Sequence, residues 1–126
     1  MEFVTYEIGK KLQEKGYPYR YNRFGYRLIY SDECTIKYLW DIGAYEKEYY
    51  GEDIPCPTIN EVLKWLREEK RIDVGAVWDN GDGKWIGYTN EMDMPDLVGE
   101  YMLPNTYDTY ELAALASIEY VLDNLI

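Results

Sequence analysis

The sequence predicts an α+β fold in which three helices cover an antiparallel sheet of about four to five strands. Apolar residues recur at helical spacing near both ends and in the middle of the chain. Segments rich in β-branched and aromatic residues lie between these helices, and short turns join them in pairs, as in antiparallel hairpins. This separation of helices from strand pairs favours an α+β layer over a doubly wound sheet. The predicted order is α-β-β-(β)-α-β-β-α.

The first helix is expected over residues 4–15. Val4, Ile8 and Leu12 recur at helical spacing and form its apolar face. Gly16 follows, and glycine accepts the left-handed conformation that ends many helices.

A β-rich region follows the first helix. Residues 17–30 are rich in tyrosine and are expected to form a short hairpin or one bent strand, with a turn at residues 22–25. A further strand is expected over residues 35–45. Residues 46–57 are interpreted as a connector because they contain a glycine and two prolines.

The second helix, over residues 58–70, has the clearest local signal in the chain. The segment Thr58-Ile-Asn-Glu61 fits a capping box, in which the threonine hydroxyl accepts from the backbone N–H of the glutamate and the carboxylate reaches back. An amphipathic apolar run follows at once, so the helix should bury one broad face.

A hairpin is expected after this helix. Residues 72–78 alternate like a half-buried strand, residues 79–83 form an Asn-Gly and Asp-Gly turn, and residues 84–89 return as the partner strand. This pairing would make Trp78 and Trp85 cross-strand neighbours.

The last part of the chain is expected to be a loop and a helix. Residues 90–107 are long and apolar for a loop, so they would pack as a flap, cover a sheet edge or meet a partner. The helix over residues 109–125 would have Asp108 as its N-cap, with Glu111 three residues on. Its expected apolar face comprises Leu112, Leu115, Ala116, Ile118, Val121, Leu122 and Leu125.

The length of 126 residues favours a single domain over 1–126, with a weak two-part organisation into 1–50 and 57–126 as the alternative. The start of the chain lacks the pattern of a signal peptide, and no apolar run has the length of a membrane span. Cys34 and Cys56 are therefore interpreted as free thiols of a cytoplasmic protein.

The charge of the chain is unevenly distributed. There are 24 acidic and 13 basic side chains, a formal charge of −11. From residue 72 onward there are eleven acids and one base, Lys84, whereas residues 10–30 hold six bases and one acid. An acidic surface of this kind is suited to a basic protein partner or to mimicry of DNA, and its simpler interpretation is a solvated surface that favours solubility.

A candidate interaction surface lies in the first, basic part of the chain. Arginine alternates there with aromatic residues at Tyr19, Arg20, Tyr21, Arg23, Tyr26 and Arg27. Aromatic rings beside guanidinium groups can stack on single-stranded nucleic acid. The overall charge opposes this role, and an amphipathic strand pair with solvated arginines is the favoured interpretation.

Enzyme chemistry has little support in the sequence. The chain contains no histidine, which removes the commonest general base and metal ligand. The segment Asp79–Gly83 lacks the spacing of a calcium loop and is interpreted as a turn. A pair of carboxylates across a cleft would support an enzyme, but no spacing requires one. No catalytic, cofactor-binding or metal-binding residues are assigned.

Three segments resemble a family of small uncharacterised proteins from gut-bacterial genomes and their phages. They are Tyr6-Glu-Ile-Gly-Lys-Lys-Leu-Gln-Glu-Lys-Gly, Pro57-Thr-Ile-Asn-Glu-Val-Leu-Lys-Trp-Leu-Arg-Glu-Glu-Lys and Tyr107-Asp-Thr-Tyr-Glu-Leu-Ala-Ala-Leu-Ala. The resemblance implies a mobile-element or phage-related origin, and no catalytic residues are carried over. The favoured function is a non-enzymatic acidic protein-interaction module that binds a protein partner or a second copy of itself. The alternative is contact with single-stranded nucleic acid through residues 17–30.

Overall fold

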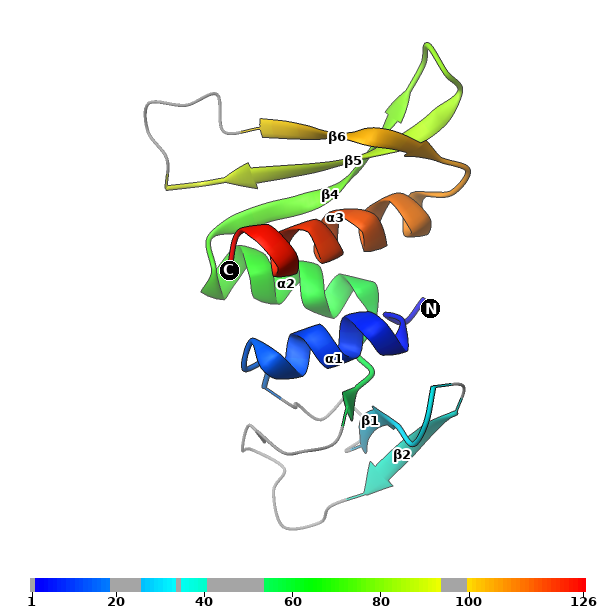
Figure 1. The fold of residues 1–126 in the computed structure, drawn as a ribbon, viewed down its shortest axis with the longest axis vertical. Helices are drawn as coiled ribbons and strands as arrows, with labels where there is room; N and C mark the ends of the chain where they lie inside the picture. Colours follow the sequence, from blue (N-terminus) through cyan, green and yellow to red (C-terminus); the bar gives the residue numbers. More distant parts are fainter. Residues whose placement is uncertain (1, 19–25, 34, 41–53, 94–99) are drawn as a thin grey trace. The chain divides into compact units, whose positions relative to one another are not determined.

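The computed structural model describes residues 2–18, 26–33, 35–40, 54–93 and 100–126, and these form three helices and six strands. The elements in chain order are α1 (Tyr6–Glu14), β1 (Tyr26–Tyr30), β2 (Ile36–Trp40), β3 (Ile54–Pro55), α2 (Ile59–Glu69), β4 (Ile72–Asp79), β5 (Lys84–Glu91), β6 (Glu100–Tyr107) and α3 (Tyr110–Asn124) (Figure 1). The predicted α+β class is confirmed, and the order of helices and strands roughly fits the prediction, with β6 as an additional strand before α3. The strands form two separate three-stranded sheets, in the orders β2-β1-β3 and β4-β5-β6, where one sheet was expected.

The chain divides into two compact units, which are described in turn. The N-terminal unit comprises residues 3–57, and the C-terminal unit comprises residues 58–126 together with Met1 and Glu2. A single domain over residues 1–126 stays a prediction.

The N-terminal unit contains α1 and the sheet β2-β1-β3, whose pairings are antiparallel. β3 lies within the segment predicted to be a connector, where Pro55 stands opposite Ile29 of β1. This pairing is compatible with proline because β3 is an edge strand. α1 approaches β3 closely at Gly9, where a Cβ atom would lie 2.5 Å from the carbonyl oxygen of Pro55.

The C-terminal unit contains α2, α3 and the antiparallel sheet β4-β5-β6, and Figure 1 shows both helices on the same side of the strands. The predicted hairpin is confirmed, with Trp78 of β4 directly opposite Trp85 of β5. The predicted capping box of α2 is also present, because Thr58 Oγ1 accepts from the N–H of Glu61 at 3.2 Å and the carboxylate accepts from the N–H of Thr58.

The interpretation of residues 90–107 as a loop is wrong for its second half, which is strand β6. β6 pairs with β5 at Glu100–Met102 and again at Thr106 and Tyr107, with one register irregularity between Ile86 and Tyr88. Pro104 interrupts the strand pattern in the sequence, and the irregularity interrupts the regular pairing of the two strands. Both are tolerated because β6 is an edge strand of the sheet.

The structure corrects the expected N-cap of α3 and part of its expected apolar face, of which Ile118, Val121 and Leu122 are buried as predicted. The N-cap is Thr109, whose hydroxyl accepts from the backbone N–H of Leu112, and Asp108 precedes it. Leu112 itself is half exposed. The buried residues of α3 are Ala113, Ala114, Ser117, Ile118, Val121 and Leu122. Small residues face the sheet because α3 lies close to the backbone of the strands. The hydrophobicity of the residues does not indicate which positions must be small.

None of the helices in the described segments is both long enough and apolar enough to cross a lipid bilayer.

Candidate interaction surface

The surface that the sequence predicts lies mostly outside the described residues. Tyr19, Arg20, Tyr21 and Arg23 fall outside them altogether, and Tyr26 and Arg27 are described only as the first two backbone positions of β1, opposite Trp40 and Leu39. The nucleic-acid contact through residues 17–30 therefore stays a prediction. The described surface with the most distinctive features belongs to the C-terminal unit.

One face of the C-terminal sheet is covered by α3. Ser117 Oγ donates a hydrogen bond to the carbonyl oxygen of Gly75 at 2.9 Å. A Cβ atom at Gly87 would clash with this same hydroxyl. Towards the other end of the helix, Tyr120 stacks on Tyr101 of β6 with ring centroids 5.2 Å apart. Side chains along a strand point alternately to the two faces of the sheet, and these contacts show which of the alternating positions face α3.

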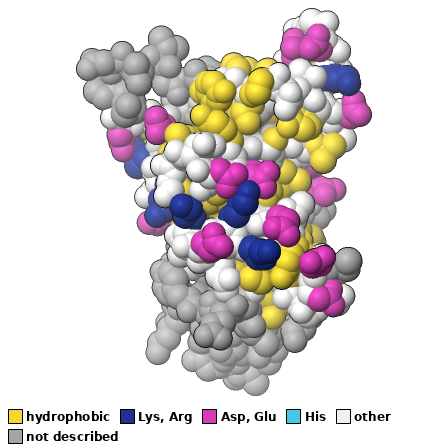
Figure 2. Space-filling view, viewed as in Figure 1, with side chains coloured by type: hydrophobic (Ala, Val, Ile, Leu, Met, Phe, Trp, Pro, Cys, Tyr) yellow, Lys and Arg dark blue, Asp and Glu magenta, His cyan; other side chains and the backbone are white. Residues whose placement is uncertain are grey.

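The other strand positions point to the opposite face, which we call the open face because α2 and α3, the described helices of this unit, pack on the other side. Its apolar members are Val77, Ile86, Tyr88 and Met102. The ring of Tyr88 lies against Gly75, where a Cβ atom would be 3.2 Å away. Met102 is 40% exposed. Figure 2 shows hydrophobic side chains gathered on the surface over β5 and β6.

The helix-side face becomes exposed towards the hairpin turn. Along β4, Ile72 and Val74 are buried, Ala76 is half-buried, and Trp78 is 49% exposed. Figure 1 shows the hairpin of β4 and β5 extending beyond the start of α3. Because no helical turn covers the sheet there, a large aromatic side chain at the end of β4 remains half in solvent.

Trp78 belongs to a row of three aromatic rings at this end of the unit. Its centroid is 5.4 Å from that of Trp85, with an interplanar angle of 72°. Trp85 in turn meets Tyr110 of α3 edge to face, at 5.4 Å and 88°. Edge-to-face packing of this kind stabilises aromatic pairs beyond the area they bury. The row holds Trp78 in a defined orientation although half of its surface is exposed.

Acidic residues are close in the chain to members of the aromatic row. Asp79 ends β4, Asp82 lies in the adjacent hairpin turn, and Asp108 and Glu111 flank the start of α3. The base of this region, Lys84, pairs with Asp108 at 3.4 Å. Four acids against one base give this end of the unit a formal charge of −3.

The segment Asp79–Gly83 is a turn, as predicted. Asp79 Oδ1 accepts a hydrogen bond from the backbone N–H of Gly81 at 2.9 Å, and Gly83 adopts a φ of 65° that suits glycine. The described residues contain no group of three or more Cys, Asp or Glu side chains placed to hold a metal ion.

The N-terminal unit contains a partly buried tyrosine next to a cysteine. The hydroxyl of Tyr30 donates a hydrogen bond to the carbonyl oxygen of Val4, and its ring packs edge to face with that of Tyr6. Burial raises the pKa of Tyr30 above its ordinary value, and the neighbouring Cys56 thiol raises this pKa further. Cys56 is fully buried, whereas Cys34 lies outside the described residues. A phenol with a raised pKa stays protonated at neutral pH and is a poor proton donor, so this pair is interpreted as packing.

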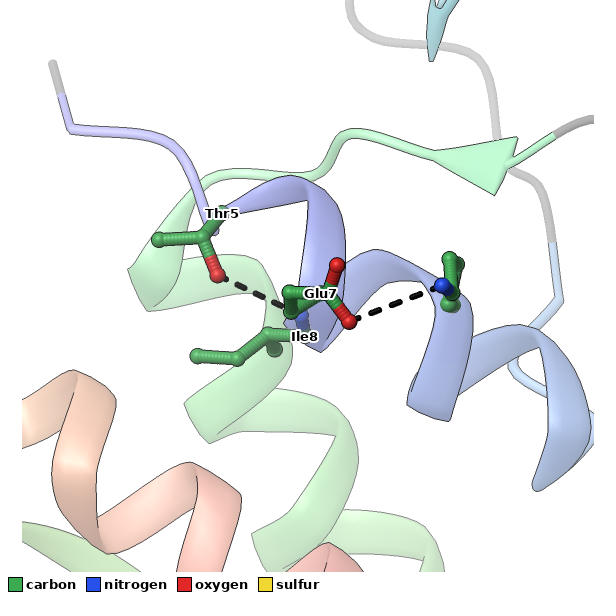
Figure 3. A network of polar contacts seen from close by, with 4 residues as sticks. Thr5, Glu7 and Ile8 are labelled. Carbon is green, nitrogen blue, oxygen red and sulfur yellow. Dashed lines mark hydrogen bonds and ion pairs between the residues drawn. The ribbon is translucent and has the colours of Figure 1, made fainter. Parts of the chain in front are cut away.

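The polar contacts at the start of α1 are structural (Figure 3). Thr5 caps the helix by accepting from the backbone N–H of Ile8 at 3.2 Å. Glu7 pairs with Lys10 one turn on at 3.5 Å. A cap and an exposed pair at this spacing stabilise a helix and are common on protein surfaces.

The sequence identified the pairing of Trp78 with Trp85 but not the exposure of Trp78 or its link to Tyr110. Both depend on where α3 starts relative to the end of the hairpin. The corrected N-cap, Thr109, places Tyr110 in the first turn of the helix. No local pattern of apolar residues in the sequence indicates how the start of α3 is aligned with the end of the hairpin.

No protein-family model matches the chain, and neither a curated protein nor a solved structure matches it significantly. The resemblance to proteins of gut bacteria and their phages therefore stays a prediction. The function has to be argued from the residues themselves.

Proposed function

We propose that this chain is a small, non-enzymatic, acidic interaction module that binds a basic protein through its C-terminal unit. The observation that supports this most is the half-exposed Trp78, held by Trp85 at an end of the unit where acids outnumber bases by four to one. Tryptophan and tyrosine are enriched among the residues that dominate binding energy at protein interfaces.

The electrostatics favour a basic protein over a nucleic acid. Residues 72–126 carry a formal charge of −10, which repels a phosphate backbone. The same field accelerates the approach of a positively charged partner and disfavours neutral or acidic ones. The exposed apolar side chains Tyr101, Met102 and Leu112 add area for contact on this unit.

The cellular setting is part of the proposal. The three segments that resemble proteins of gut bacteria and their phages support an origin in a mobile element, and the buried thiol of Cys56 is compatible with a cytoplasmic location. A basic nucleic-acid-binding protein of the host is a partner of the right charge.

The test is affinity capture with the full chain after nuclease treatment, followed by titration calorimetry with the purified captured protein. We compare the natural chain with Trp78→Ala and with Lys64→Ala, a change at an exposed position of α2. We expect the capture of a basic protein. This protein should bind the natural chain and the Lys64 variant with equal affinity, and the Trp78 variant at least tenfold more weakly.

Three results would contradict the proposal. The first is loss of capture after nuclease treatment. An oligonucleotide gel shift that is lost in Arg20→Ala and Arg23→Ala would then support nucleic-acid contact through residues 17–30. Purified partners could bind all three chains equally. Sedimentation could show that the chain associates with itself through the C-terminal unit and binds nothing else.

A further inference from the structure

We infer that the exposed ring face of Trp78 is the docking site for an arginine side chain of the basic partner. This inference rests on the proposed function and specifies what the partner presents.

The geometry leaves about half of Trp78 available to a partner. Trp78 packs against Trp85 at an interplanar angle of 72°. Trp85 is itself held by Tyr110, so the ring that supports Trp78 is fixed in turn by a third ring. A ring fixed in this way loses little side-chain entropy on binding, which favours affinity.

The electrostatics select a cation. The face of an indole ring is electron-rich and attracts a cation placed over it, and tryptophan is the best of the aromatic residues for this purpose. Asp79 is the next residue in the chain after Trp78, and Asp82 lies exposed in the same turn. These carboxylates, close to Trp78 in the chain, add to the negative charge of this end of the unit, which favours an incoming positive charge.

The cations of this part of the chain do not satisfy the site. Lys84 is engaged with Asp108 at 3.4 Å. Cation–π contacts do form elsewhere in the described structure, where Lys70 lies over Trp65 and Lys10 lies over Tyr6. Lysine side chains of this molecule therefore form cation–π contacts with Trp65 and Tyr6. The ring of Trp78 contacts Trp85 and solvent instead.

Arginine fits this site better than lysine. The guanidinium group is planar, is weakly hydrated and stacks on a single aromatic face, whereas an ammonium group keeps its water more strongly. Among the described rings, Trp78 meets that of Trp85, whereas the aromatic cages for methylated lysine enclose a cation on several sides. A planar cation gains most from a single face.

The experiment uses three short basic peptides that are identical except for a central Arg, Lys or Gln. Binding to the full chain is followed by tryptophan fluorescence and by the NMR signals of the indole N–H groups. We expect the Arg peptide to bind about fivefold more tightly than the Gln peptide, with the largest signal change at Trp78. The Lys peptide should bind with intermediate affinity.

Three variants separate the contribution of the ring from that of the charges near it. Trp78→Ala should remove the preference for Arg over Gln, whereas Trp78→Phe should keep part of it. Asp82→Asn should weaken the Arg and Lys peptides alike, by about twofold, because it removes charge and leaves the ring in place. Lys64→Ala is the control and should leave all three affinities unchanged.

Equal affinity of the Arg and Gln peptides, or an Arg preference that survives in Trp78→Ala, would overturn the inference. If the captured partner also loses affinity in Trp78→Ala, the proposed module stands and only the arginine site fails. If the peptides discriminate as expected but no protein partner is captured, the arginine site stands and the proposed function fails.

Discussion

The hydroxyl of Ser117 in α3 donates a hydrogen bond to the carbonyl oxygen of Gly75 and lies against Gly87 on the neighbouring strand. This contact brings the helix close to the backbone of the sheet, because Gly87 places no side chain between them. The approach explains why the buried face of α3 contains Ala113 and Ala114.

Gly87→Ala is expected to destabilise the protein by about 1–3 kcal/mol, because its added methyl group would clash with Ser117 Oγ and force the helix away from the sheet. Urea unfolding followed by circular dichroism measures this loss. Gly81→Ala is the control, because a Cβ atom there would lie 3.3 Å from a carboxylate oxygen of the exposed Asp79–Gly83 turn. If the Gly87 variant is as stable as the control, the close approach of α3 is contradicted.

Thr109→Ala is expected to cost about 1 kcal/mol of stability, because the hydroxyl of Thr109 caps α3. Asp108→Ala should cost about 0.5 kcal/mol or less, since its pair with Lys84 is largely exposed to solvent. Thermal unfolding of the two variants in parallel gives the comparison. A larger loss in the Asp108 variant would restore Asp108 as the cap.

The stability of the protein is expected to fall at alkaline pH because of Tyr30. The pKa of this phenol is raised in the folded state by burial, so folding favours the protonated form. The contribution is fully present below the ordinary tyrosine pKa of about 10 and is lost as the pH rises through the folded-state pKa.

The measurement is urea unfolding at a series of pH values in the natural chain and in Tyr30→Phe. The variant should be less stable at neutral pH, because it loses the hydrogen bond to the carbonyl oxygen of Val4. Its stability should also fall less steeply above about pH 10. Identical slopes in the two chains would show that Tyr30 does not account for the alkaline loss.

Gly9→Ala is expected to destabilise the N-terminal unit although alanine favours helices. The higher helix propensity is worth about 1 kcal/mol, whereas the new methyl group would lie 2.5 Å from the carbonyl oxygen of Pro55 and 3.0 Å from the side chain of Ile54. Overpacking of this kind costs about 1–3 kcal/mol, so the clash should outweigh the gain. Hydrogen exchange of α1 amides reports the effect locally, and slower exchange in the variant would contradict the close packing.

The elements that the sequence predicted well are those whose signals lie within a few residues. The capping box of Thr58 and Glu61 needs only a hydroxyl and a carboxylate three residues apart, and it is present. The hairpin around Asp79–Gly83 follows from turn residues between alternating strands, and its register places Trp78 opposite Trp85 as expected. Such features depend on local geometry, which the chain encodes directly.

The features that the sequence did not predict depend on partners distant in the chain. β6 becomes a strand because β5 supplies its hydrogen-bonding partner, despite Pro104 and an irregular register. The buried face of α3 is selected by Gly75 and Gly87, which lie about 30 to 40 residues earlier. The exposure of Trp78 was likewise not predicted, whereas the surface predicted at the arginine-rich segment stays a prediction.

The sequence by itself determined the α+β class, the positions of the three helices, the tight hairpin and the concentration of acid in residues 72–126. Only the tertiary structure decided that the strands form two sheets, that small residues of α3 meet the glycines of β4 and β5, and that Trp78 remains half exposed. Caps, turns and charge are properties of neighbouring residues. Burial and sheet membership depend on which distant surfaces meet, and that is set by packing.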